Sequence, residues 1–197
     1  MTEFKRARTK EQIVSRQQKI IDACDRIYTE SGYDAVNFKS ISEMTSISRP
    51  SIYNYYNTKE EVSLDLVRSY FASWNEELAN SFGREPVMSR EVFCRTITDM
   101  IGRRMVMLEI NSSLERIVDL KMVIGETIEL IQGQYERSFS RSPEEGDLFT
   151  RLFLAFMHGL YPMSHPTEKQ REAMRICRRD LETDFDLLCY TGLMRLV

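Results

Sequence analysis

The chain has 197 residues, of which 42% are hydrophobic and 29% charged. This is the balance of a folded protein with a sizeable core, and it argues against an intrinsically disordered chain. No apolar run approaches the roughly 18 residues that a membrane span needs, and no secretory signal precedes the basic start of the chain. We therefore expect a cytoplasmic protein.

The cysteines and histidines argue against a metal cluster or a disulfide framework. The two histidines are too few for such a cluster, and no CxxC pair occurs. Isolated cysteines in a chain of this length are typical of free thiols in a reducing compartment, with a redox sensor as the rarer alternative. We therefore predict no metal and no cofactor. The cysteines are Cys24, Cys94, Cys177 and Cys189.

The charge is unevenly distributed along the chain. The formal net charge is −3, but residues 1–60 carry ten basic and eight acidic side chains, whereas residues 61–197 carry 17 and 22. The basic start favours a polyanionic partner there, and the acidic remainder would stay away from phosphates. Residues 1–10 are either a flexible basic arm that reaches the DNA backbone or minor groove, or a solvated end.

The first predicted helix begins at Lys10 or Ser15 and ends at Ser31, where Gly32 can adopt the left-handed conformation that closes a helix. Apolar residues recur at helical spacing along it, which predicts one buried face. The residues of that face are Ile13, Ile20, Cys24, Ile27 and Tyr28.

Two short helices and a tight turn follow. Asn37 can cap a helix over residues 38–44, residues 45–47 form the turn, and Ser48 can cap a second helix with Pro50 in its first turn. Two short helices crossing steeply, the second with a polar and aromatic outer face, are a helix-turn-helix, whose second helix enters the DNA major groove. The residues expected to face inward are Ile41, Met44, Ile47, Ile52 and Tyr56.

Residues 32–62 resemble the N-terminal DNA-binding domain of the TetR family of transcriptional regulators. The matches include SRPSIY at residues 48–53 and YYNTKEE at residues 55–61. Asn37 replaces the usual Thr, and Ser42 and Ser46 replace the more frequent Ala and Gly. Because Asn is an equivalent cap, these departures change little.

The resemblance implies an all-α fold, in which an N-terminal three-helix helix-turn-helix domain is joined by a long helix to a C-terminal helical bundle. We place the DNA-binding domain at residues 1–57 and the ligand-binding and dimerisation domain at residues 58–197. The joining helix begins at Thr58, which forms a capping box with Glu61, and runs to about Ser81, with Gly83 as its stop. A shift of the second domain would then swing the first.

The remaining two-thirds of the chain also reads as helical, without strand alternation. Residues 83–86 are a linker. Pro162 is expected to end the most apolar segment, residues 147–161. Residues 167–197 form either one helix or two that break near residues 180–184. Three other helices are expected. One begins near residue 89, a short one covers residues 114–120, and a third covers residues 123–140, with Gly125 and Gly133 inside it.

The outer face of the second short helix is the candidate DNA-reading surface. Arg49 can donate two hydrogen bonds to a guanine edge, and Asn54 can pair with adenine or bridge to phosphate. The other candidates suit phosphate contacts or belong to the matched motif, with solvated surface or packing within the domain as the alternative. These are Asn37, Lys39, Ser48, Pro50, Ser51, Tyr53, Tyr55 and Lys59.

The resemblance also implies a small-molecule pocket inside the C-terminal bundle. Flexible methionines and flat rings suit an adaptable apolar cavity, although the same residues at helical spacing are also typical of a plain core. His158 is more typical of a hydrogen-bonded core or interface residue than of a ligand contact. The candidate ligand-binding residues are Trp74, Phe93, Met100, Met105, Met122, Phe153 and Met157.

Residues 147–161 are apolar on more than one face, which predicts a helix covered both by its own domain and by a partner subunit, with a helix buried in a monomer as the alternative. The resemblance implies that the last two long helices of each subunit form a four-helix dimer bundle. The candidate interface residues are Phe149, Leu152, Phe156, Leu160 and Leu188.

These observations predict a homodimeric regulator of transcription, not an enzyme, since no phosphate loop, nucleophile elbow or metal-ligand spacing occurs. It would bind an inverted-repeat operator in double-stranded DNA, act as a repressor, and be released by a small-molecule effector. In the cell it would lie in the cytoplasm, at the nucleoid when bound. The alternative is an architectural or partner-protein-responsive DNA-binding protein without a small-molecule effector.

Overall fold

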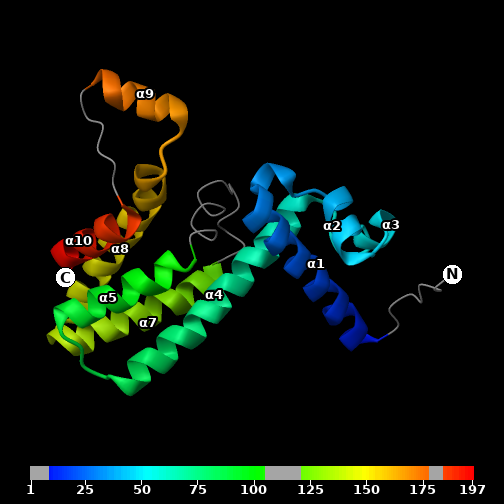
Figure 1. The fold of residues 1–197 in the computed structure, drawn as a ribbon. Coiled ribbons are helices and arrows are strands. Elements are labelled where there is room, and N and C mark those ends of the chain that lie inside the picture. Colours follow the sequence, from blue (N-terminus) through cyan, green and yellow to red (C-terminus); the bar gives the residue numbers. More distant parts are fainter. Residues whose placement is uncertain (1–8, 105–120, 178–183) are drawn as a thin grey trace. The chain divides into compact units, whose positions relative to one another are not determined.

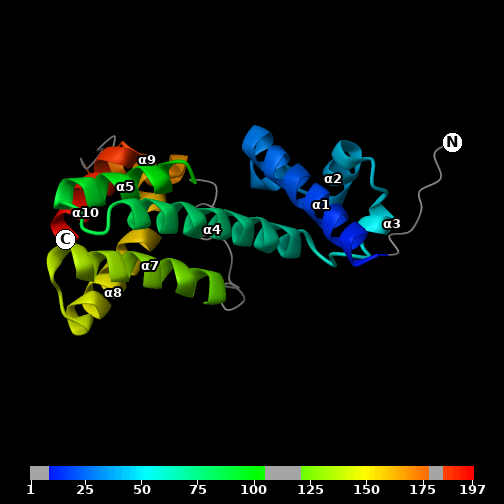
Figure 2. The same cartoon turned by 90° about the horizontal axis from the view of Figure 1, so that it is seen from below.

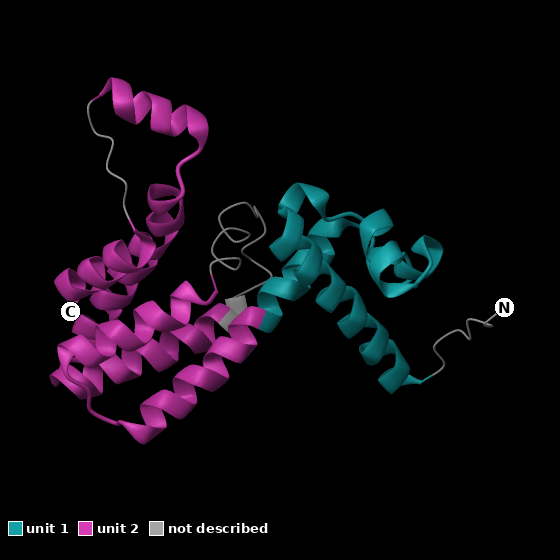
Figure 3. Cartoon of the chain, viewed as in Figure 1, with its two compact units in different colours: residues 1–69 teal, residues 70–197 magenta. Residues whose placement is uncertain are grey.

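The computed structural model describes residues 9–104, 121–177 and 184–197, and the side chains of residues 121–123 are outside that description. All regular secondary structure in these ranges is helical (Figure 1), which confirms the predicted all-α class. The chain divides into two compact units, residues 1–69 and residues 70–197 (Figure 3). We call them unit 1 and unit 2.

Unit 1 is built from α1, a short 3-10 helix, α2, α3 and the first turns of α4. Helix α1 packs against the 3-10 helix and α2, and α2 packs against α3. Its core includes the fully buried Ile20, Cys24, Ile41 and Ile52. The helices are α1 (Lys10–Ser31), η1 (Tyr33–Ala35), α2 (Phe38–Thr45), α3 (Arg49–Ile52) and α4 (Lys59–Arg84).

Two of the predicted inward residues of unit 1 face outward. Ile13 is 39% exposed and Met44 is 41% exposed. Residues 9–15 are all exposed, so the first turns of α1 bury no residue against the rest of unit 1. Helical spacing identifies an apolar face, but it cannot show whether another element covers that face.

The predicted helix ends of unit 1 are confirmed by their hydrogen bonds. Gly32 has a positive φ of 78°, and its N–H donates to the Tyr28 carbonyl. The side-chain oxygen of Asn37 accepts from the N–H groups of Lys39 and Ser40, and the Ser40 hydroxyl accepts from the Asn37 N–H. This reciprocal capping box fixes where α2 begins.

The ends of α4 differ in detail from the prediction. Thr58 Oγ1 accepts from the Glu61 N–H, but the Glu61 carboxylate accepts from the Asn57 N–H at 2.7 Å, one residue before the expected partner. The helix also continues through Gly83 to Arg84. A glycine in a helix costs only about 1 kcal/mol, and Pro86 shortly beyond is the stronger stop signal.

Unit 2 consists of the rest of α4 and five further described helices. Helix α10 packs against α5 and α8, and α7 packs against α8 (Figure 2). An aromatic cluster fills the core: the Tyr135 and Phe149 rings stack with centroids 4.1 Å apart, and Phe93 contacts the rings of Phe139 and Phe149. The helices are α5 (Arg90–Gly102), α7 (Lys121–Phe139), α8 (Pro143–Ser164), α9 (Glu168–Ile176) and α10 (Phe185–Leu196).

Helix α8 is longer than predicted at both ends. It begins at Pro143, because Ser142 and Glu145 form a capping box and proline suits the first helical position. It also passes through Pro162, which was expected to end it, and stops at Ser164. Pro162 lies in the last turn, where its missing N–H removes only one hydrogen bond of an otherwise complete helix.

The last segment of the chain forms two helices, α9 and α10, rather than one. Helix α7 runs unbroken through Gly125 and Gly133. The predicted helix over residues 114–120 and most of the expected break, residues 180–183, lie outside the described residues, as does Met105.

Candidate functional site

The turn between α2 and α3 fixes the direction of α3. Ser46 adopts the left-handed conformation with φ 58°, and its N–H donates to the Ser42 carbonyl. The Thr45 hydroxyl donates to the Ile41 carbonyl at 2.7 Å and accepts from the Ile47 N–H at 3.2 Å. The predicted turn is thus held by local hydrogen bonds, while Ile47 is buried beneath it.

Helix α3 is a single turn anchored by one side chain. Ile52 is completely buried, whereas Arg49 and Pro50 are exposed. Ser48 stands at the N-cap as predicted, but its hydroxyl bonds the Ser51 hydroxyl at 2.8 Å instead of a backbone N–H. The two serines are therefore tied to each other at the start of α3.

The residues after α3 extend its outer face. Tyr53 is 59% exposed, and its ring meets the Phe38 ring edge-on with centroids 4.8 Å apart. Asn54 is exposed and donates from Nδ2 to the Pro50 carbonyl at 3.3 Å. Tyr55 is half-buried. Sequence reasoning missed the supporting role of Phe38, whose only signal was an aromatic residue directly after a helix cap.

Two candidate contacts are already engaged within unit 1. The side-chain oxygen of Asn37 caps α2, and the Lys59 ammonium lies 4.3 Å from the centroid of the Tyr33 ring, a cation–π arrangement. Lys39, by contrast, is exposed on α2. The structure therefore brings Lys39, Arg49 and Tyr53 to the outer surface as the candidates best placed for DNA.

A partly buried hydrogen bond ties the end of the motif to α4. The Tyr56 hydroxyl donates to Asp65 at 2.9 Å, and Arg68 pairs with the same carboxylate at 2.7 Å. Burial, together with the charge of Asp65, raises the pKa of Tyr56 well above its usual range, so the phenol stays a neutral donor. The segment that follows α3 is thereby fixed to the first turns of α4.

The candidate ligand-binding residues of unit 2 are mostly core residues. Phe93 is completely buried and packs among other rings, as the plain-core alternative expects. Met105 and the side chain of Met122 lie outside the described residues. The remaining candidates are all less than 10% exposed: Trp74, Met100, Phe153 and Met157.

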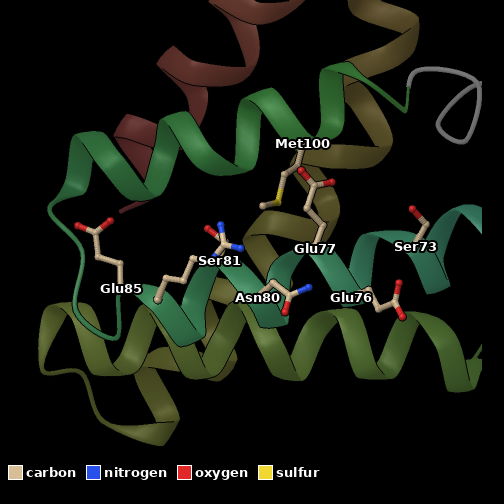
Figure 4. A pocket seen from close by; sticks show the side chains of 8 residues that line it. Ser73, Glu76, Glu77, Asn80, Ser81, Glu85 and Met100 are labelled. Atoms are coloured by element: carbon tan, nitrogen blue, oxygen red, sulfur yellow. The ribbon is translucent and has the colours of Figure 1, made fainter.

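An open groove of about 550 Å³ runs along α4 beside α5 (Figure 4). Met100 is the one predicted ligand residue in its lining. Glu77, at its edge, accepts hydrogen bonds from Arg103 and Arg104. The groove is polar, so it is not the apolar cavity expected from the sequence. The other lining residues are Ser73, Glu76, Asn80, Ser81, Arg84 and Glu85.

The candidate dimer residues divide into two groups. Phe149 and Leu160 are 3% and 1% exposed, so their own subunit already covers them and little of either side chain is left for a partner. Leu152 is 46% exposed, while Phe156 and Leu188 are half-buried. Leu148 on α8, which the sequence analysis did not select, is 58% exposed, and Leu187 on α10, next to the candidate Leu188, is 64% exposed.

The cysteines form no disulfide, and three of the four are buried. Burial raises the pKa of Cys24 to about 12 and of Cys94 and Cys189 to about 11, whereas Cys177 is exposed.

Among the described residues, no group of three or more His, Cys, Asp or Glu side chains is placed to hold a metal ion. His158 is exposed, with Nδ1 2.8 Å from the Leu154 carbonyl. No helix in the described part of the chain is long and apolar enough to cross a membrane.

The fold and this surface define the class of protein: a helix-turn-helix DNA-binding regulator with an all-helical second unit. Residues 20–66 match the family described as "Bacterial regulatory proteins, tetR family", and residues 69–186 match "Tetracyclin repressor-like, C-terminal domain". The chain belongs to the TetR family. It is therefore a DNA-binding transcriptional regulator and not an enzyme.

Two known proteins show how far the similarity extends. The chain is 34% identical over 55 residues to the biofilm operon icaADBC HTH-type negative transcriptional regulator IcaR of Staphylococcus epidermidis, a match that covers 28% of this chain and 30% of that protein. The fatty acid degradation regulator FadR from Bacillus halodurans has a similar structure, with a TM-score of 0.61, 16% identity, and coverage of 92% of this chain and 94% of that one. At this low identity the second likeness shows the fold alone.

Proposed function

We propose that this regulator is a homodimeric repressor that reads an inverted-repeat operator through α3 and is released by a small-molecule effector bound in unit 2. The observation that carries the proposal is the outer face of the helix-turn-helix. Arg49 and Tyr53 are exposed there, on a helix anchored beneath by the fully buried Ile52. A rigid helix that presents a guanidinium suits base-edge recognition in the major groove.

Each exposed side chain has a defined role in this proposal. Arg49 donates to a guanine edge and so specifies sequence, whereas Lys39 and the Tyr53 hydroxyl bind phosphates and fix the position of the helix. Asn54 is held against the Pro50 carbonyl through one amide hydrogen, which leaves its oxygen directed to a base or a bridging water. Asn37, Ser48 and Ser51 shape the surface through the hydrogen bonds described above.

Dimerisation through α8 and α10 is supported by the apolar side chains that these helices expose. Leu148, Leu152 and Leu187, on α8 and α10, are each between 46% and 64% exposed, and the family resemblance implies a dimer bundle built from the last two long helices of each subunit. A two-fold dimer places two recognition helices about one turn of DNA apart, and this is why the operator should be an inverted repeat.

The proposed mechanism is a shift between two conformations. The effector binds better to a conformation in which the two recognition helices are wrongly spaced for adjacent major grooves, so it weakens DNA binding by its differential affinity. The repressor role is supported by the similarity of the chain to IcaR, a negative transcriptional regulator. The rival candidate, a regulator without a small-molecule effector, is favoured by the aromatic packing around Phe93.

The test is selection of bound duplexes from a random DNA pool, with the wild type, Arg49→Ala and Arg171→Ala side by side. Arg171 is an exposed arginine on α9 of unit 2, so its substitution removes the same charge far along the chain from α3. We expect the wild type and Arg171→Ala to enrich the same inverted repeat and Arg49→Ala to relax it at one position per half-site. General, salt-sensitive binding without enrichment in all three proteins would overturn the proposal.

A further inference from the structure

Trp74 is the only tryptophan of the chain, and its indole donor has no partner among the described residues. It lies on α4 within unit 2, is 3% exposed, and its indole Nε1–H has no hydrogen-bond partner in the structure as described. Buried N–H groups are almost always paired, because leaving one unpaired costs the free energy of its lost hydration. An unpaired donor of this kind therefore indicates a missing acceptor.

The polar groups nearest to Trp74 along α4 are engaged elsewhere. Asn75 donates to Glu126 at 3.0 Å and accepts from the Thr127 hydroxyl, and Ser73 accepts from Arg104. The residues one turn away on the same face, Phe71 and Leu78, are buried and apolar. A water molecule needs two to four polar partners, so a single N–H beside apolar neighbours is a poor site for one.

The surroundings also determine the charge of the acceptor. A buried carboxylate needs a cation or several donors to offset its desolvation. Arg104, the buried arginine described in unit 2, already pairs with Glu77 at 2.6 Å. The Trp74 N–H is thus a lone neutral donor, which matches a neutral oxygen and not an ionised one.

We propose that the Trp74 Nε1–H is the polar anchor of the effector site, and that the effector is a neutral, largely apolar molecule with a carbonyl, ester or ether oxygen that accepts this hydrogen bond. The inference rests on the proposed effector function and specifies its chemistry. Trp74 does not line the polar groove along α4, so the two places are distinct. Trp74 lies on α4, and the first turns of α4 carry Asp65, which accepts the hydrogen bond of the Tyr56 hydroxyl. A ligand at Trp74 would therefore contact the same helix that holds the end of the helix-turn-helix.

The experiment uses the full-length chain labelled with ¹⁵N, in which the single tryptophan gives one indole N–H signal. Three probes of similar size are titrated separately: acetophenone, ethylbenzene and benzoate. We expect acetophenone to move the signal downfield in a saturable way, because its carbonyl accepts the hydrogen bond, whereas ethylbenzene and benzoate do not. Trp74→Phe keeps an aromatic ring but removes the donor and with it the indole signal, so its affinities are compared with those of the wild type by calorimetric titration. The substitution should weaken acetophenone binding about tenfold and leave ethylbenzene binding almost unchanged.

Several outcomes would overturn the inference: no saturable shift with acetophenone, equal shifts with the three probes, or equal affinities of wild type and Trp74→Phe. Circular dichroism of the variant checks that it is folded. Operator affinity, measured with the same probes, separates the two proposals. A compound that weakens DNA binding equally in wild type and Trp74→Phe would leave the effector function intact and reject only the role of Trp74. A Trp74-dependent shift without any change in operator affinity would count against the effector function.

Discussion

Gly192 on α10 is predicted to be a position where alanine destabilises the protein, although alanine normally stabilises a helix. A Cβ atom added there would lie 2.5 Å from Cε2 of Phe156 on α8, whereas ordinary contacts are 3.4–4 Å. The two helices approach closely because Gly192 has no side chain. Alanine would therefore force the Phe156 ring to retreat by roughly 1 Å.

The expected magnitude follows from two opposing effects. Replacing glycine by alanine inside a helix contributes about 1 kcal/mol of stability, while overpacking a tight contact costs about 1–3 kcal/mol. Phe156 is only half-buried and can move, so we expect Gly192→Ala to lower the free energy of unfolding by about 1 kcal/mol. Gly125 on α7 is the matched control, since an added Cβ meets open space there. Gly125→Ala should raise the free energy of unfolding by up to about 1 kcal/mol.

The assay is equilibrium unfolding in urea, with both variants and the wild type measured at several equal protein concentrations, because dimerisation would couple stability to concentration. The informative quantity is the difference between the two alanine variants, about 2 kcal/mol. If both variants were stabilised equally, the close approach of α8 and α10 at Gly192 would be refuted. If the Gly192→Ala effect grew with dilution, the substitution would also be acting on subunit association.

Three further outcomes are expected. Asn37→Ala should lower the free energy of unfolding by about 1 kcal/mol, measured by urea titration, because it removes the acceptor of two backbone N–H groups; an unchanged midpoint would contradict the cap. Tyr53→Phe should weaken operator binding without changing the preferred sequence, as expected of a phosphate contact, and a changed sequence preference in the duplex selection would reject that role. Only Cys177 should react rapidly with a thiol reagent at pH 8, and rapid reaction of Cys177→Ser would show that a buried thiol is accessible. The free energy of unfolding should fall as pH rises from about 9, because the thiols of the unfolded chain ionise there while burial keeps Cys24 protonated in the folded protein until about pH 12.

Local chemistry explains which parts of the fold could be predicted. The cap at Asn37, the N-terminal position of Ser48 before α3 and the closing glycine at position 32 lie where the sequence places them, because each depends on residues within four positions along the chain. The errors at Gly83 and Pro162 have a related cause. Both residues lower the stability of a helix, but near the helix end this loss of stability is small. Helix α4 therefore continues through Gly83, and α8 continues through Pro162.

Long-range packing explains most of what the sequence could not reveal. Ile13 has the spacing of a buried residue but no element covers it within unit 1, and Phe149 has the apolar character of an interface residue but stacks on Tyr135 of its own subunit. The pairing of Glu77 with Arg103 and Arg104 joins residues 26 and 27 positions apart, which no periodic pattern encodes. These features depend on which helices become neighbours.

The same distinction separates the two candidate sites. The DNA-reading surface is carried by α2, the turn and α3, so its exposed residues follow from a continuous motif of about thirty residues. The proposed effector site depends on the contact between α7 and α4. Thr127 and Glu126, both distant in sequence, engage Asn75 beside Trp74, and no described residue accepts from the indole N–H. A buried donor without an acceptor cannot be predicted from the spacing of residues along the chain. For this reason the chemistry of the effector can differ among chains whose recognition helices have similar sequences.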